Sequence, residues 1–263
     1  MSSKKKDEEV MLKFQGLNFI IPKETECFWA YYGICFVGEY DQLLSHISSS
    51  DVVVDAGANV EIFTLLAAKK AKLVIAVEPQ PENFEHLRRN VRLNRARNVI
   101  LINKALSNYV GDGFICGRGP FAALSYEGAS IKVTTIDEMI KEFGLDGFDV
   151  LKMDIEGEEL KTLNGDFLRN VRELMVECHH GTSSIIRGRL EEEGFTVSEW
   201  SLSPFRVLKR ILTNLRSFVN AELRLDFPVT TLILKYALGL GLHPVAPANR
   251  TSGIKLLYAV RSI

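Results

Sequence analysis

The sequence predicts an α/β fold in which a mostly parallel sheet carries helices on both faces. The first observation is the repeated alternation of short apolar runs with amphipathic segments between residues 51 and 200. The second is Gly57, a glycine that follows the first apolar run closely and predicts a tight turn. Parallel sheets bind their ligands at this end of their strands. The third is the composition, because 46% hydrophobic and 25% charged residues are typical of a packed core and exclude a disordered chain.

Short apolar runs and the segments between them give the order of the elements. The runs that predict buried strands lie at residues 51–55, 73–78, 99–105, 148–154 and 171–178, and two last strands are predicted at 195–200 and 254–260. Between the strands, helices are predicted over residues 62–70, 82–94, 135–143, 158–168 and 182–193. The stretch 111–132, rich in glycine and aromatic residues, predicts a hairpin-like excursion.

This pattern divides the chain into four regions. We expect an N-terminal extension and cap over residues 1–50, a ligand-binding core over 51–200, a basic amphipathic helical insertion over 201–250, and the final strand of the core over 251–263. The insertion carries seven basic and two acidic residues, a net charge of +5, whereas the whole chain has a formal net charge of -1. The near-neutral total argues against a globally basic nucleic-acid-binding protein.

Four scattered cysteines and the lack of a visible targeting segment predict a cytoplasmic protein. Cys27, Cys35, Cys116 and Cys178 form no CxxC pair, so neither a disulfide framework nor a structural zinc site is expected. The first residues contain no apolar segment typical of a secretory signal. The longest apolar stretch, 229–242, is shorter than the roughly 20 residues that a membrane-spanning helix needs.

The first turn and the acid after the second strand favour a nucleoside-type ligand. Glu78 ends the second strand, 21 positions after Gly57, and an acid there can accept hydrogen bonds from a ribose diol. A dinucleotide site needs glycine where this chain has Asn59 and Ile62, which makes an NAD-type oxidoreductase the less favoured interpretation. S-adenosylmethionine (SAM) has no phosphate and is compatible with both side chains, and Asp55 suits its cationic amino-acid tail.

Three ordered motifs resemble the FkbM family of SAM-dependent methyltransferases. They are DAGAN at 55–59, EPQPENFEHLRRNVRLN at 78–94 and LKMDIEGEE at 151–159, and the resemblance covers roughly residues 39 to 180. It implies a class I, Rossmann-like methyltransferase fold with seven strands, the last of them antiparallel. It also implies methylation of a hydroxyl, typically on a sugar or on a polyketide or glycolipid product. The acceptor expected here is a saccharide, a glycolipid or a related small molecule.

The resemblance also implies roles for individual residues. Residues near the methionine end of SAM would be Asp55, Gly57 and Asn59, and Glu78 would hold the ribose hydroxyls. The segment from Asn103 to Ala105 would lie near the adenine, and Asp154 and Glu156 would face the transferred methyl group.

Acid–base chemistry at the same edge of the sheet gives three candidate catalytic residues. Asp154 could act as the base or hold the SAM amine, and Glu156 could bind substrate or cap the next helix. His179 follows the fifth strand and is a second candidate base, because the usual pKa of histidine is close to neutral. These three residues and Glu177 could instead gather a divalent ion, but nothing in their spacing demands one and no metal is predicted.

One position departs from the family pattern. The chain has Glu61 where the family normally has glycine. A carboxylate at the start of a helix can favour the helix dipole, or it can crowd the carboxylate of SAM. The alternative to an active enzyme is therefore a catalytically degenerate binding protein that keeps the fold.

The basic insertion predicts an amphipathic helix that starts at Ser203-Pro204. Its apolar face would contain Phe205, Leu208, Ile211, Leu212, Leu215, Phe218 and Val219. It is interpreted either as a lid packed on the core or as a peripheral membrane contact through residues 203–242. A nucleic-acid substrate is not expected, since the fourth strand is followed by DIEG rather than by an NPPY-like motif typical of base amino-group methylation.

Overall fold

The computed structural model describes residues 9–23, 25–60, 62–117, 122–201, 203–224 and 254–261. Seven strands form the main sheet, in the order β12-β13-β11-β10-β3-β4-β5. Their bounds are Val52–Ala56 (β3), Leu73–Val77 (β4), Val99–Ile102 (β5), Val150–Met153 (β10), Glu173–Cys178 (β11), Phe195–Glu199 (β12) and Lys255–Arg261 (β13). Neighbours from β5 to β11 pair in parallel, whereas β13 runs antiparallel to both β11 and β12. The predicted class I sheet is therefore confirmed.

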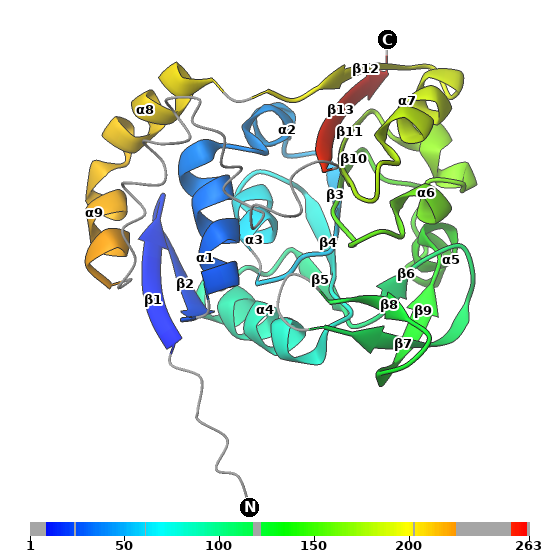
Figure 1. The fold of residues 1–263 in the computed structure, drawn as a ribbon, viewed down its shortest axis with the longest axis horizontal. Helices are drawn as coiled ribbons and strands as arrows, with labels where there is room; N and C mark the ends of the chain where they lie inside the picture. The colour runs from blue at the N-terminus through cyan, green and yellow to red at the C-terminus, as the bar shows by residue number, and fades with distance from the viewer. Residues whose placement is uncertain are drawn as a thin grey trace, which may run out of the picture.

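Helices cover both faces of this sheet, as predicted (Figure 1). One face carries α1 (Thr25–Tyr32), α2 (Asp41–His46), α3 (Ile62–Ala68) and α4 (Pro81–Leu93), and the other carries α5 (Ile136–Glu142), α6 (Glu159–Thr162) and α7 (Ser183–Glu192). Alternate residues of one strand enter opposite cores, so Val53 packs with the first set of helices and Val54 with the second. Apolar runs without polar alternation are the sequence signature of such doubly covered strands.

Two predicted elements differ from the structure by more than a shift of one or two residues at an end. The predicted strand 99–105 ends at Ile102, because the Asn103 amide donates to the carbonyl oxygens of Glu78 and Pro79 and leads the chain out of the sheet. The predicted helix 158–168 is split into α6 and the 3-10 helix η3 (Asp166–Asn170).

The glycine-rich excursion forms a second, small sheet in the order β6-β9-β7-β8. Its strands are Ala105–Leu106 (β6), Gly111–Cys116 (β7), Ala123–Ser125 (β8) and Ala129–Thr134 (β9). The hairpin-like character predicted for residues 111–132 is confirmed by the antiparallel pairing of β7 with β8 and β9. This sheet stands beside the carboxyl ends of the main strands and forms one wall of the pocket described below (Figure 1).

An N-terminal cap precedes the core. It consists of the hairpin β1 (Glu9–Phe14) and β2 (Leu17–Pro22), helix α1, the π-helical turn η1 (Gly33–Val37) and α2. Its interior is a group of aromatic rings in edge-to-face contact, such as Phe14 with Phe36 at 5.5 Å between centroids. These rings join the first core of the main sheet, so the cap and the sheet share one apolar interior.

Two helices of the basic insertion pack against this cap. They are α8 (Pro204–Thr213) and α9 (Leu215–Arg224), and the Ser203 hydroxyl accepts from the Arg206 amide, which confirms the predicted helix start. Arg210 fixes α8 to the cap, because its guanidinium donates to the carbonyls of Ile34 and Cys35 and pairs with Asp41. The predicted second apolar contact at 229–242 lies outside the described residues. Within the described part of the chain, no helix is long and apolar enough to cross a membrane.

Candidate active site

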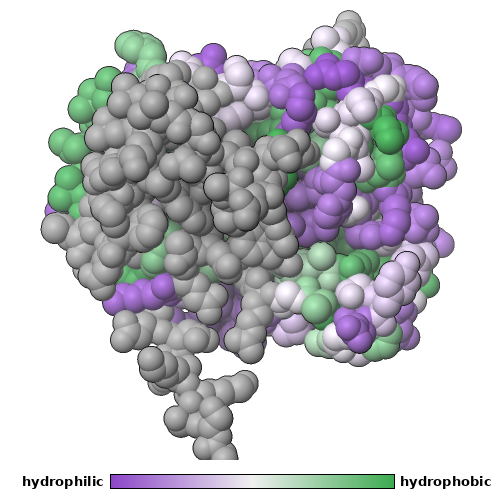
Figure 2. Space-filling model, viewed as in Figure 1, coloured by the Kyte–Doolittle hydropathy of each residue, from purple (hydrophilic) through white to green (hydrophobic). Residues whose placement is uncertain are grey.

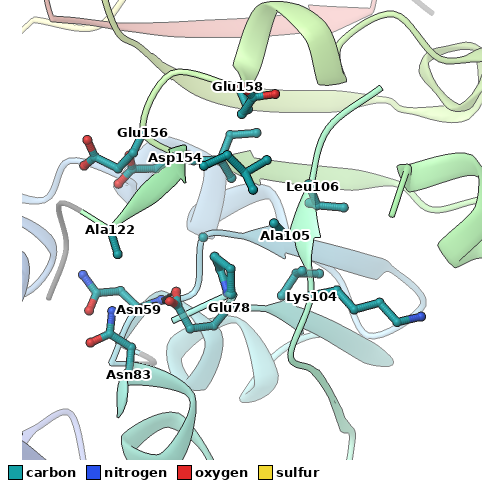
Figure 3. Close-up of a pocket in the computed structure, with 15 residues that line it drawn as sticks. Asn59, Glu78, Asn83, Lys104, Ala105, Leu106, Ala122, Asp154, Glu156 and Glu158 are labelled. Atoms are coloured by element: carbon teal, nitrogen blue, oxygen red, sulfur yellow. Dashed lines mark hydrogen bonds between the residues drawn. The ribbon is translucent and has the colours of Figure 1, made fainter. Parts of the chain in front are cut away.

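A pocket opens at the carboxyl ends of β3, β4 and β10 (Figure 3). The space between its lining atoms, together with the open solvent at its mouth, is about 540 Å³. Six predicted site residues line it: Gly57, Asn59, Glu78, Ala105, Asp154 and Glu156. Lys104, within the predicted segment from Asn103 to Ala105, also lines it, and further lining residues to which the sequence analysis gave no site role include Asn83, Leu106, Ala122, Leu124 and Glu158.

The floor of the pocket is a turn that only glycine can form. Gly57 has a φ of +77°, and a Cβ added there would lie 1.7 Å from the Asp154 carbonyl oxygen. The amides of Gly57 and Ala58 both donate to the Val77 carbonyl, at 2.9 and 3.0 Å. The ends of β3, β4 and β10 are thereby held in close contact at one point.

Glu78 is a buried acid at the end of β4, with an exposure of 4%. Its carboxylate accepts hydrogen bonds from the backbone N–H of Asn59 at 2.8 Å and from the backbone N–H of Gln80 at 2.9 Å. Burial raises the pKa of Glu78 to about 7, although these hydrogen bonds act in the opposite direction. A fixed carboxylate facing a pocket in this way is suited to accept hydrogen bonds from a ribose diol, the role predicted from the sequence.

Asp55 and Asn103 support the pocket without lining it. Asp55 is fully buried beneath the turn, where it accepts from the Thr64 hydroxyl at 2.5 Å and lies 3.3 Å from the Lys152 ammonium. Lys152 also donates to the Gly57 carbonyl at 2.5 Å. Asn103 holds the segment that follows β4 through its bonds to the main chain. The structure therefore places both predicted cofactor residues behind the wall.

Charges on the pocket wall are mostly negative. Glu78, Asp154, Glu156 and Glu158 contribute carboxylates, and the one cation among the described lining residues, Lys104, pairs with Glu142 at 2.7 Å. Such a wall favours a cationic ligand and opposes a phosphate group. The residues present thus fit SAM, which carries a sulfonium and an ammonium, and they do not fit a pyrophosphate.

A second group of ionisable side chains adjoins the pocket, where β10 and β11 end. His179 is 5% exposed, and its Nε2 lies 3.6 Å from Glu156, 3.8 Å from Glu177 and 4.0 Å from Asp154. Its Nδ1 bonds to Glu159 at 2.9 Å. The structure therefore brings the three predicted catalytic residues together.

The carboxylates around His179 determine its protonation state. Burial by itself lowers the pKa of His179, but the Glu159 hydrogen bond and the charges of Asp154 and Glu156 outweigh burial and raise the pKa to about 10. At neutral pH His179 is thus an imidazolium, which donates but does not accept a proton. Burial, followed by repulsion from Asp154, raises the pKa of Glu177 well above its usual range.

The same residues offer ligand atoms for a divalent ion. One atom each from Asp154, Glu156 and His179 lie within 4.8 Å of one another. Oxygen and imidazole donors of this kind suit several divalent metals. Acidic groups also gather in this way without a metal, so the metal interpretation left open by the sequence stays untested.

Two residues of the N-terminal cap face this group and were not predicted. Loss of hydration and then repulsion from Asp154 raise the pKa of Glu39 to about 8, and the pKa of the buried Tyr40 is also raised by burial and by Asp154. The Tyr40 ring lies 5.7 Å from the Lys152 ammonium. Neither residue belongs to a recognisable motif, so the sequence carries no local signal for them.

Comparison with known proteins agrees with this geometry. Residues 55–197 match the family model described as the methyltransferase FkbM domain. The chain belongs to the FkbM methyltransferase family. It is accordingly a methyltransferase that uses SAM as cofactor, and the resemblance seen in the motifs is confirmed.

The chain is also similar to two curated proteins and to one solved structure. The chain is 27% identical over 248 residues to methyltransferase sdnD of Sordaria araneosa, covering 75% of this chain and 95% of that protein. It is 32% identical over 148 residues to the hexuronic acid methyltransferase AglP of Haloferax volcanii, covering 53% and 60%. A solved FkbM methyltransferase from Methylobacillus flagellatus aligns with a TM-score of 0.47 and 21% identity, over 70% of this chain and 48% of that one.

Glu61, the departure from the family pattern, lies outside the described residues. Its effect on SAM binding therefore stays a prediction.

Replacing Gly57 tests the close approach of the turn. Gly57→Ala is expected to destabilise the fold by about 1–3 kcal/mol through backbone strain, and to weaken SAM binding at least ~10-fold because the Asp154 backbone must move. Gly144→Ala is a matched control, since Gly144 also has a positive φ of +62° but its added Cβ would meet no atom. Calorimetric titration with SAM measures the difference, and equal affinities for both variants would contradict this account of the turn.

The charge state of His179 predicts a pH dependence of stability. Folding raises its pKa from 6.5 to about 10, so its stabilising contribution is complete below pH 6.5 and is lost as the pH rises to about 10. Urea unfolding across this range is expected to show a declining free energy of unfolding that His179→Gln makes flatter. His86→Gln, at a histidine whose pKa is lowered, should keep the wild-type slope. Identical slopes for wild type and His179→Gln would show that His179 is not charged.

Proposed function

We propose that this methyltransferase transfers the methyl group of SAM to a hydroxyl of a saccharide, a glycolipid or a related small molecule. The observation that carries the proposal is the position of Asp154, which lines the cofactor pocket directly beside Gly57. Its Oδ1 atom is buried and has no hydrogen-bond partner among the described residues. The nearest His179 nitrogen, Nε2, lies 4.0 Å from this oxygen, beyond hydrogen-bond distance, so its hydrogen-bonding capacity remains for an acceptor hydroxyl.

In this proposal Asp154, His179 and Glu159 have different roles. The bound cofactor supplies an electrophilic methyl group. Asp154 accepts the proton of the acceptor hydroxyl, so that the hydroxyl oxygen could take the methyl group that bound SAM would supply. His179 remains protonated, and its positive charge holds Asp154 and Glu156 in place. Glu159 orients the His179 imidazole through its hydrogen bond with Nδ1, the ring nitrogen on the side away from Asp154.

The small sheet offers a surface for the acceptor. Tyr126 is fully exposed and Tyr109 is 42% exposed, and they lie in segments that join strands of the small sheet. Exposed aromatic rings of this kind are suited to pack on the apolar face of a sugar. The name of the Haloferax relative, a hexuronic acid methyltransferase, supports a saccharide acceptor.

A cytoplasmic location is part of the proposal. The four cysteines are free thiols in the structure, and three of them, Cys27, Cys35 and Cys178, are buried. Unpaired thiols are typical of a reducing compartment.

Removing the proposed base separates catalysis from cofactor binding. Asp154→Asn keeps the size of the side chain and the backbone contact with Gly57, so SAM affinity is expected to change little. The turnover number should fall by ~10²–10⁴-fold, because an amide does not accept the proton. Asp166→Asn, at an exposed carboxylate on η3, is the matched control and should leave both values unchanged.

The assay follows transfer of labelled methyl groups to saccharides and glycolipids of different uronic acid content. Undiminished transfer by Asp154→Asn would refute the proposed role of Asp154. If the wild-type protein binds SAM but methylates none of these acceptors, the result would favour the degenerate binding protein.

A further inference from the structure

The apolar residues of α8 and α9 lie on two faces, and only one of them packs against the protein. Val207, Phe218 and Ala221 are at most 6% exposed. The Phe218 ring contacts the cap in edge-to-face geometry, 5.2 Å from the Phe36 ring and 6.2 Å from the Tyr32 ring. This inward face is enough to dock both helices on the cap.

The second face points away from the cap and consists of large apolar side chains. They are Phe205, Leu208, Leu212, Leu215 and Val219, with exposures of 75%, 56%, 62%, 51% and 46%. Figure 2 shows hydrophobic residues along the left edge of the molecule, where Figure 1 places α8 and α9. We call these five residues the outer stripe.

Sequence spacing makes the outer stripe continuous. Its members recur every three or four positions, which places them on one side of a helix. The amide of Asn214 bonds to the Arg210 carbonyl and that of Phe218 to the Asn214 carbonyl, so the helical path continues across the junction of α8 and α9. At 1.5 Å per residue the stripe is about 20 Å long.

Positive charge borders the outer stripe. Arg206, Lys209 and Arg216 are exposed, and the charge of Arg206 acts on Asp41 of the cap. Among the residues of α8 and α9, the only acid is Glu222. A row of large apolar side chains with exposed cations beside it complements an interface that is apolar inside and anionic at its surface.

We propose that the outer stripe binds the surface of an anionic lipid bilayer, with α8 and α9 lying in the headgroup region. The apolar side chains enter the boundary of the acyl chains, and Arg206, Lys209 and Arg216 contact lipid phosphates. A surface of this kind on a water-soluble protein would otherwise leave a contiguous apolar patch in water. The inference does not depend on the acceptor proposed above.

Vesicle sedimentation tests the proposal with the full chain. We expect the wild-type protein to bind vesicles of phosphatidylcholine and phosphatidylglycerol, to bind phosphatidylcholine alone at least ~10-fold more weakly, and to lose binding as salt is raised. Failure of the wild-type protein to bind the anionic vesicles would overturn the proposal.

Two variants separate the apolar and the charged contributions. Leu208→Ser combined with Leu212→Ser should weaken binding at least ~10-fold. The matched control is Val110→Ser with Ile185→Ser, which removes side chains of similar exposure elsewhere. Lys209→Glu with Arg216→Glu should abolish the preference for anionic lipid, whereas Lys72→Glu with Arg97→Glu should not.

Circular dichroism and thermal unfolding establish that each variant is folded. Binding that is equal in wild type, stripe variant and control would overturn the proposal. Concentration-dependent self-association of the wild-type protein that the stripe variant lacks, without vesicle binding, would assign the outer stripe to a second copy of the chain instead.

Discussion

The buried ammonium group of Lys152 connects the parts of the molecule that form the site. Pairing of β3 with β10 sets Lys152 directly opposite Asp55, and the two charges lie 3.3 Å apart in the interior. The same ammonium bonds to the Gly57 carbonyl, and so it fixes the turn against which Asp154 packs. A buried charge is tolerated only when it is paired and hydrogen-bonded, so Lys152, Asp55 and the turn depend on one another.

Excess negative charge follows from this arrangement. Within the described residues, the cations Lys152 and His179 lie among six acids, which are Asp55, Asp154, Glu156, Glu159, Glu177 and Glu39. Burial raises the pKa of both Glu39 and Glu78, so a charged carboxylate at either position is costly. A cationic cofactor would reduce that cost when it binds.

Patterns in the sequence predicted the sheet, the turn and the meeting of Asp154, Glu156 and His179, because strand ends of a parallel sheet share one edge. These patterns did not distinguish residues that line the pocket from residues that lie behind its wall. The Asp55 side chain, next to the end of β3, points into the interior. Its direction follows from the contact with Lys152 on another strand, which the sequence around Asp55 does not indicate. Glu39 and Tyr40 reach the site through the packing of the cap, which no local pattern encodes. On α8 and α9, Phe218 was placed on one face with Leu212 and Val219, but packing against the cap separates it from them.

Titration of the protein with SAM, with Glu78→Gln as the comparison, tests the central claim most directly. The variant keeps the shape of the side chain and an oxygen that can accept from the backbone N–H of Asn59. It removes the negative charge that would accept hydrogen bonds from the ribose hydroxyls. The account predicts saturable binding by the wild-type protein and at least ~10-fold weaker binding by Glu78→Gln. Glu85→Gln, at an exposed acid on α4, should bind as the wild type does. Absence of binding by the wild-type protein, or equal binding by Glu78→Gln, would contradict the placement of the cofactor in this pocket.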